Sequence, residues 1–197
     1  MSDNDQNNVK YHVVGYGSLM SHKSLQGTIP DRDFKQVIIK GYQRIFNVMA
    51  EKGKSPNTVN LIQKKGYACN GVLFTVNEED LAKIKERESP EYELQKTAVF
   101  DFTSGKKMGS AFIAIDHTIN IDIFNQKPNK SYFILCREAA YHLSETFGRY
   151  WDQTTYTSSG EKITTWLQKN KSYDTISKKS IQSRLAAFLK QRIFRIP

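Results

Sequence analysis

The chain has 197 residues, of which 39% are hydrophobic, and this size and composition suit one globular domain better than two. Because it has no apolar run of about 18 residues and only two isolated cysteines, we expect neither a membrane-spanning helix nor a disulfide framework or zinc site. The net charge of +9 lies mostly in residues 161–197, where nine Lys and Arg stand against two acidic residues, so the rest of the surface is not expected to bind nucleic acid.

The first predicted strand, residues 11–16, runs directly into a turn that contains Gly15, Gly17 and Ser18. The polar residues before it lack the pattern of a signal peptide, and we expect 1–10 to be a disordered lead-in. Glycines adopt backbone angles closed to other residues, so consecutive N–H groups in this turn can converge on one point. Such a turn suits a carboxylate or a developing oxyanion, although glycines after a strand are also common in purely structural turns.

The later elements predict an α+β fold with a curled or barrel-like sheet and helices grouped mostly in the second half of the chain. The further predicted strands are 33–40 and 43–50 about a Gly41-Tyr42 turn, 58–63 and 68–76 about a hairpin turn at 64–66, and 92–102 and 107–116. The predicted helices are 77–88, 131–147 with Gly148 just beyond its end, 161–169 and a basic helix over 180–193. We therefore expect one domain over 11–170 and a basic C-terminal helical extension over 171–197.

Glu88 is the candidate general base. Asn77 caps the preceding helix, and Pro90 stops it at about Glu88. The carbonyl groups at the end of a helix make the potential negative, which raises the pKa of a carboxyl group there toward the range of a base that works near neutral pH. Arg87 opposes this effect if its side chain points toward Glu88. The alternative is an ordinary solvated carboxylate in a group with Glu86, Glu91 and Glu93.

Three segments read together resemble the γ-glutamyl cyclotransferase-like family. Residues 16–19 (Tyr-Gly-Ser-Leu) resemble its signature loop, and 41–47 resemble its Gly-aromatic-x-Arg-x-Phe segment. Residues 84–88 followed by Tyr92 resemble its Leu-Asp-x-x-Glu stretch. Residues 128–132 also look like the start of its late helix, so the resemblance spans 11–167.

The resemblance implies a small mixed β-barrel flanked by helices and an enzyme that releases 5-oxoproline from a γ-glutamyl amino acid, amine or peptide. By this resemblance, Glu88 takes the proton of the substrate ammonium group and returns it to the leaving nitrogen. The backbone amides of Tyr16, Gly17, Ser18 and Leu19 bind the glutamyl carboxylate or the oxyanion, and Tyr92 lines the pocket. No metal or organic cofactor is implied, and the expected compartment is the cytoplasm.

The chain also departs from the family pattern. Lys85 replaces the Asp of the Leu-Asp stretch, Glu91 stands where a small residue is common, and a late glycine-rich segment after Phe147 is missing. One alternative is therefore a catalytically inactive, cyclotransferase-like binding module. The basic helix either docks on the domain or contacts an acidic partner, nucleic acid or an anionic membrane surface. The sequence gives no indication of the leaving group or the oligomeric state.

Overall fold

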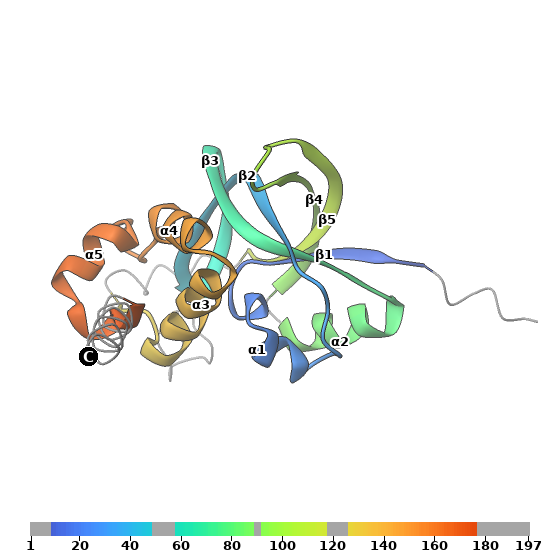
Figure 1. Ribbon diagram of the computed structural model, residues 1–197, viewed down its shortest axis with the longest axis horizontal. Helices are drawn as coiled ribbons and strands as arrows, with labels where there is room; N and C mark the ends of the chain where they lie inside the picture. Colours follow the sequence, from blue (N-terminus) through green and yellow to red (C-terminus); the bar gives the residue numbers. More distant parts are fainter. Residues whose placement is uncertain (1–8, 49–57, 89–91, 118–125, 177–197) are drawn as a thin grey trace, which may run out of the picture.

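The computed structural model describes residues 9–48, 58–88, 92–117 and 126–176 (Figure 1). The strands are β1 (Tyr11–Gly15), β2 (Lys35–Val48), β3 (Thr58–Val76), β4 (Tyr92–Asp101), β5 (Lys107–Asp116) and β6 (Thr155–Tyr156). The helices are η1 (Ser18–Met20), α1 (His22–Gln26), α2 (Glu78–Glu88), α3 (Lys130–Leu143), α4 (Glu145–Thr154), α5 (Ile163–Lys169) and η3 (Lys171–Tyr173). Most of the expected lead-in and the whole basic helix predicted over 180–193 lie outside the described residues.

The strands form one mixed, six-stranded sheet in the order β3-β1-β5-β4-β2-β6. The pairs β1–β5 and β2–β6 are parallel and the other pairs are antiparallel. The predicted α+β class is confirmed. An additional pairing joins β2 back to β3, so the strands β3, β1, β5, β4 and β2 form a ring of hydrogen-bonded neighbours, consistent with the curled sheet that was expected.

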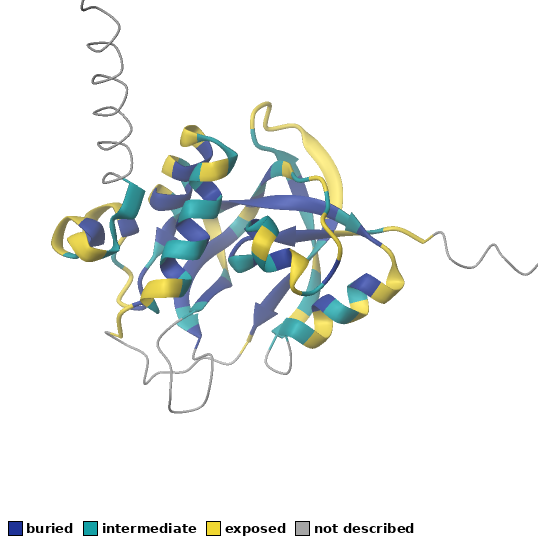
Figure 2. Cartoon of the chain, turned by 60° about the horizontal axis from the view of Figure 1, so that its bottom comes forward, coloured by how far each residue is buried: buried dark blue, intermediate teal, exposed yellow. Residues whose placement is uncertain are grey.

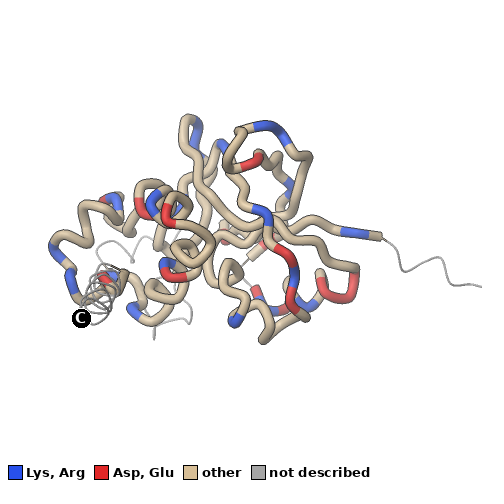
Figure 3. Tube along the Cα trace, in the orientation of Figure 1, with Lys and Arg blue, Asp and Glu red and all other residues tan. Residues whose placement is uncertain are grey.

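Helices cover the sheet in two groups. Figure 1 shows α3, α4 and α5 together on one side, and α1 and α2 near the end of β1. Buried residues follow the strands and the inner faces of the helices, and exposed residues lie on the outer faces (Figure 2). Charges of both signs are distributed over both groups of helices and the strand ends (Figure 3). The hydrophobic core therefore lies between the sheet and its helices, as amphipathic helices require.

Two predicted turns are instead irregularities within long strands. Strands β2 and β3 pair from Lys35↔Leu73 to Val48↔Thr58, and the register shifts between Lys40 and Tyr42. Gly41 there has φ 84°, and Gly66 on the facing strand has φ 85°. Glycine accommodates such angles at a bulge, where the ladder continues. The predictions of a turn at Gly41-Tyr42 and of a hairpin at 64–66 were therefore wrong.

The predicted helix over 131–147 is two helices. Ser144 is extended (φ −172°, ψ 158°) and separates α3 from α4, and its side chain accepts a hydrogen bond from Phe147 N. Ser144 is thus the N-cap of a new helix. Gly148 lies inside α4 rather than beyond a helix end, and a Cβ there would come within 2.4 Å of the Tyr141 ring. Close packing of the two helices explains this glycine.

Candidate functional site

A small cavity lies where the end of β1, η1, the last turn of α2 and the first turn of α3 meet. Its volume is about 20 Å³, which suffices for roughly one water molecule. The four residues from Tyr16 to Leu19 line one side, and Glu88 and Tyr132 contribute from α2 and α3. Among the described residues that line the cavity, Glu88 is the only one with a charged side chain. The structure thus brings together five of the six predicted site residues.

Tyr92, the sixth predicted residue, is not among the described residues that line this cavity. It is the first residue of β4, and its hydroxyl donates a hydrogen bond to the main-chain oxygen of Val59 at 3.2 Å. Val59 itself lines the cavity. Tyr92 therefore contacts a residue of the cavity wall.

Close approach, and not a positive φ, explains both glycines of the turn. A Cβ on Gly15 would lie 2.7 Å from Leu19 Cβ. A Cβ on Gly17 would lie 2.6 Å from the Tyr132 hydroxyl and 2.7 Å from Val59 Cγ1. The φ of Gly17 is −121°, so a positive φ is not what places a glycine here. Glycine is needed because neighbouring side chains pack directly on the main chain.

The turn after Gly17 closes as the short helix η1, with Met20 N donating to Gly17 O at 3.1 Å. The first N–H groups of a helix have no partner inside it. Within the described part of the chain, no acceptor is recorded for the N–H groups of Ser18 and Leu19. These two donors belong to residues that line the cavity.

The Glu88 carboxyl is partly withdrawn from water, with 20% of its side chain exposed. Burial raises its pKa, and the positive charge of Arg87 lowers it in part. The predicted direction is confirmed, but burial is the main cause, whereas the sequence argument rested on the helix end. A carboxyl group with a raised pKa exchanges protons more readily near neutral pH.

Arg87 is not among the described residues that line the cavity, and its side chain contacts residues at the cavity's edge. The sequence left the direction of this side chain open. Its guanidinium donates hydrogen bonds to Ser18 Oγ in η1 and to Ser24 in α1. Its Nε lies 3.6 Å from Glu88 Oε1. Sequence reasoning missed this link between α2 and the turn, because the polar partners lie more than 50 residues earlier in the chain.

A scan against protein-family models matches residues 13–131 to gamma-glutamyl cyclotransferase, AIG2-like. The chain belongs to the gamma-glutamyl cyclotransferase, AIG2-like family. The matched residues include the turn of Tyr16–Leu19 and Glu88, although not Tyr132. No curated protein matches the chain.

Solved structures show the fold of this cyclotransferase family. A gamma-glutamyl cyclotransferase superposes with a TM-score of 0.61 and 16% identity, covering 73% of this chain and 86% of the other. An uncharacterised human protein gives the same score and identity, with 72% and 86% covered. A yeast gamma-glutamyl cyclotransferase specific to glutathione gives 0.53 and 16%, with 73% and 97% covered. At these identities the similarity concerns the fold alone.

Arg44, from the segment that resembles the family, also holds the turn, at Tyr16, whereas Arg87 binds it at Ser18. The Arg44 guanidinium is fully buried and donates to Tyr16 O (3.3 Å) and to both the main-chain and side-chain oxygens of Asn70 (2.6 Å each). Thr154 and Thr155 accept its remaining bonds. Burial lowers its pKa to about 10. Sequence analysis quoted this residue without giving it a role, and the structure shows that it fixes the Tyr16 carbonyl.

Tyr16 and Tyr132 bring hydroxyl groups to the cavity. Tyr16 donates a hydrogen bond to the main-chain oxygen of Ala114. Burial raises the pKa of both tyrosines well above the usual value. Both are therefore neutral near neutral pH, which leaves Glu88 as the proton-exchanging group of the cavity.

The described ranges contain no group of three or more His, Cys, Asp or Glu side chains placed to hold a metal ion. In the same ranges, no helix is long and apolar enough to cross a membrane.

Proposed function

We propose that this protein is a γ-glutamyl cyclotransferase that releases 5-oxoproline from a γ-glutamyl amino acid, amine or peptide. One observation carries the proposal: Glu88, the one carboxyl group among the described residues that line the small cavity, shares this cavity with Ser18 and Leu19. Family membership and the shared fold support the same reaction class.

The proposed reaction is an intramolecular aminolysis. The substrate's α-amine forms a bond to its own γ-carbonyl carbon, the bond from that carbon to the leaving nitrogen breaks, and a five-membered lactam closes. Glu88 takes the proton that the ammonium group loses and returns it to the leaving nitrogen, so protons balance. Because nucleophile and electrophile belong to one molecule, holding the chain folded supplies much of the rate enhancement.

The turn supplies the other half of the proposed chemistry. The N–H groups of Ser18 and Leu19 are suited to bind the glutamyl carboxylate or to stabilise the oxyanion that forms on the γ-carbonyl. Donors fixed before the reaction need no reorganisation. Arg44 and Arg87 hold this turn at two of its residues, Tyr16 and Ser18.

The cavity is smaller than a γ-glutamyl group. With a volume of about 20 Å³, it accepts a group of roughly the size of a water molecule. In this proposal the pocket widens when the substrate binds. Tyr132, whose hydroxyl closes over Gly17, is the wall residue that we expect to move.

The test is to incubate the protein with γ-glutamyl amino acids, γ-glutamyl amines and glutathione, and to detect 5-oxoproline by mass. We expect Glu88→Gln to lower the turnover of the accepted substrate by about 10²-fold or more, since it removes the general base and acid. Glu86→Gln, an exposed carboxylate of the same helix, is the matched control and should keep parental turnover.

Turnover by Glu88→Gln at the parental rate would contradict the mechanism. A wild-type protein that binds γ-glutamyl compounds without forming 5-oxoproline would instead be a binding module that keeps the family pocket.

A further inference from the structure

Arg87 joins three elements at the edge of the candidate site. Its Nη1 donates to the main-chain oxygen of Ser24 at 2.6 Å and to Thr28 Oγ1 at 2.7 Å. Its Nη2 donates to Ser24 Oγ at 2.8 Å and to Ser18 Oγ at 3.1 Å. The two terminal nitrogens of a guanidinium carry four N–H groups, so these four bonds use all of them. Only the Nε–H of Arg87 remains outside this set.

Glu88 follows Arg87 directly, but the two side chains do different things. Adjacent residues of a helix do not face each other, since they are about 100° apart around its axis. Arg87 reaches α1 and η1, whereas Glu88 lines the cavity. The distance from Arg87 Nε to Glu88 Oε1 is 3.6 Å, which is too long for a hydrogen bond. The carboxyl group therefore lies beside a positive charge without the forked pair that arginine often makes with a carboxylate.

We propose that Arg87 is a positioning residue that fixes the last turn of α2 against the Ser18 turn and holds its charge beside Glu88 without a direct hydrogen bond to the carboxyl group. The inference rests on the proposed function of Glu88 and adds a residue to that chemistry. Because four neutral oxygens hold the guanidinium, both oxygens of Glu88 stay available to a substrate proton. A forked ion pair would occupy those oxygens and keep the carboxylate ionised.

The charge of Arg87 also has a defined effect on proton exchange. Burial raises the pKa of Glu88, and Arg87 is the cation in the described chain that lowers it. Within the described part of the chain, Tyr16, Tyr132 and Cys136 also interact electrostatically with Glu88, and burial raises the pKa of each. They are neutral near neutral pH, so removal of the Arg87 charge should raise the pKa of Glu88 further.

The experiment measures the Glu88 pKa by carboxyl ¹³C NMR titration of the substrate-free protein, together with the pH profile of kcat/KM. We expect Arg87→Gln to raise this pKa, and to move the acid limb of the profile to higher pH, by about one unit. Arg87→Lys keeps the charge but cannot make four forked bonds. It should move the acid limb little and lower kcat about tenfold or more. The control is Lys85→Gln, which removes an exposed cation three residues before Glu88 on α2. It should change neither the acid limb of the profile nor kcat.

An unchanged Glu88 pKa in Arg87→Gln overturns the inference, and so does full wild-type kcat in Arg87→Lys. The NMR titration needs no turnover. If the wild type makes no 5-oxoproline, the proposed function fails. The shift of the Glu88 pKa in Arg87→Gln still tests whether the Arg87 charge lies beside Glu88. If Arg87→Gln does not fold, Ser24→Ala takes its place, because it removes one anchoring hydroxyl and keeps the charge. It should lower kcat without moving the acid limb, and an unchanged kcat would overturn the inference.

Discussion

Gly17 lies where β1 passes into η1, and the side chains around it leave no room for a Cβ. Such an atom would approach the Tyr132 hydroxyl to 2.6 Å and Val59 Cγ1 to 2.7 Å. We expect Gly17→Ala to lower the free energy of unfolding by about 1–3 kcal/mol, because overpacking forces neighbours to shift. Chemical denaturation measures this change.

Gly27 provides the matched control for this substitution. It has an ordinary helical φ of −69°, and a Cβ there meets Ser24 O at 3.5 Å, a normal contact. Gly27→Ala should leave stability unchanged or slightly higher, since alanine lowers the entropy of the unfolded chain. If Gly17→Ala were as stable as Gly27→Ala, the turn would have more space than the structure shows.

At the scale of single residues, the sequence predicted which side chains meet better than it predicted why. Residues 16–19 and Glu88 line one cavity, as the resemblance to the family implied. The direction of the Arg87 side chain could not be predicted, because it depends on oxygens of Ser18, Ser24 and Thr28 that only the folded chain brings near. Short-range patterns indicate helix ends and turns, whereas partners distant in the chain follow from packing.

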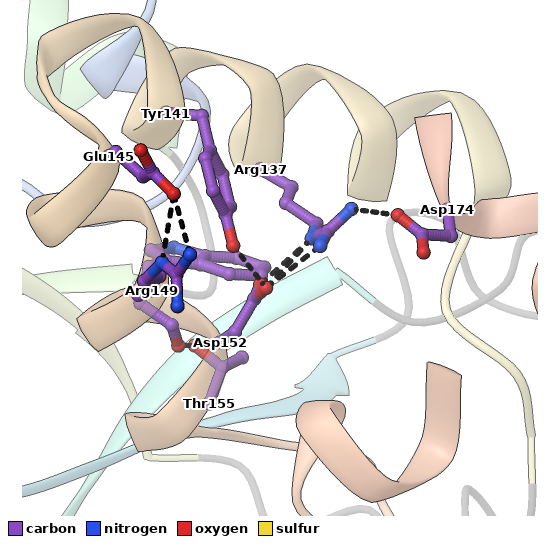
Figure 4. Close-up of polar contacts among 8 residues, drawn as sticks. Arg137, Tyr141, Glu145, Arg149, Asp152, Thr155 and Asp174 are labelled. Carbon is purple, nitrogen blue, oxygen red and sulfur yellow. Dashed lines mark hydrogen bonds and ion pairs between the residues drawn. The ribbon is translucent and has the colours of Figure 1, made fainter. Parts of the chain in front are cut away.

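Helices α3 and α4 are joined by a buried ion pair. The Arg137 guanidinium makes two-pronged bonds to Asp152, and Tyr141 donates to the same carboxylate at 2.8 Å (Figure 4). Arg137 and Asp152 have only 6% and 7% of their side chains exposed, and Asp174 binds the other side of the guanidinium at 2.9 Å. Removing one partner of such a pair leaves the other charge buried and uncompensated.

We therefore expect Arg137→Met to lower the free energy of unfolding by about 3–5 kcal/mol. Arg137→Met combined with Asp152→Leu should recover most of this loss, since both buried charges are then gone. Arg149→Met is the control, because it breaks the exposed pair with Glu145 in the same two-helix unit (Figure 4) and should change stability little. A single Arg137 variant as stable as Arg149→Met would show that the pair is not a main link between the helices.

At the scale of elements, prediction succeeded where one local signal decided the structure. Asn77 caps α2 as expected, with Asp80 N donating to its side chain at 2.8 Å, and the helix ends at Glu88. Prediction from the sequence failed where two local signals look alike. A glycine at a bulge, such as Gly41, resembles a glycine at a turn. The identity of the facing strand distinguishes them, and that depends on the whole sheet. Ser144 was missed similarly, since the apolar spacing continues across the break.

At the scale of the whole molecule, the candidate site lies where separate parts of the chain converge. Arg44 from β2 fixes the Tyr16 carbonyl, and α4 and the start of β6 supply two of its acceptors, Thr154 and Thr155. Asn70, which accepts two of its bonds, donates in turn to Phe147 O in α4. The turn is thus held by the sheet and its helices together, so the geometry of the site depends on the integrity of the fold.

The raised pKa of Glu88 links the site to the stability of the whole chain. A carboxyl group whose pKa is raised by folding binds its proton more tightly in the folded than in the unfolded state. The protonated Glu88 carboxyl contributes to the free energy of unfolding. This contribution is fully present below the pKa that Glu88 has in the unfolded chain, and it is lost as the pH rises through the higher pKa of Glu88 in the folded chain. Glu88→Gln cannot ionise, and it should therefore be more stable than the wild type in mildly alkaline solution.

Urea denaturation at about pH 4 and at about pH 8 tests this, with Glu86→Gln as the control for an exposed carboxylate on the same helix. The stability difference between Glu88→Gln and the wild type should be small in acid and should grow in favour of the variant as the pH rises. A difference that does not depend on pH would mean that folding does not raise the pKa of Glu88. The predicted result would show that the burial which makes Glu88 a suitable base also destabilises the folded chain at the pH where a base is needed, a conflict typical of functional sites.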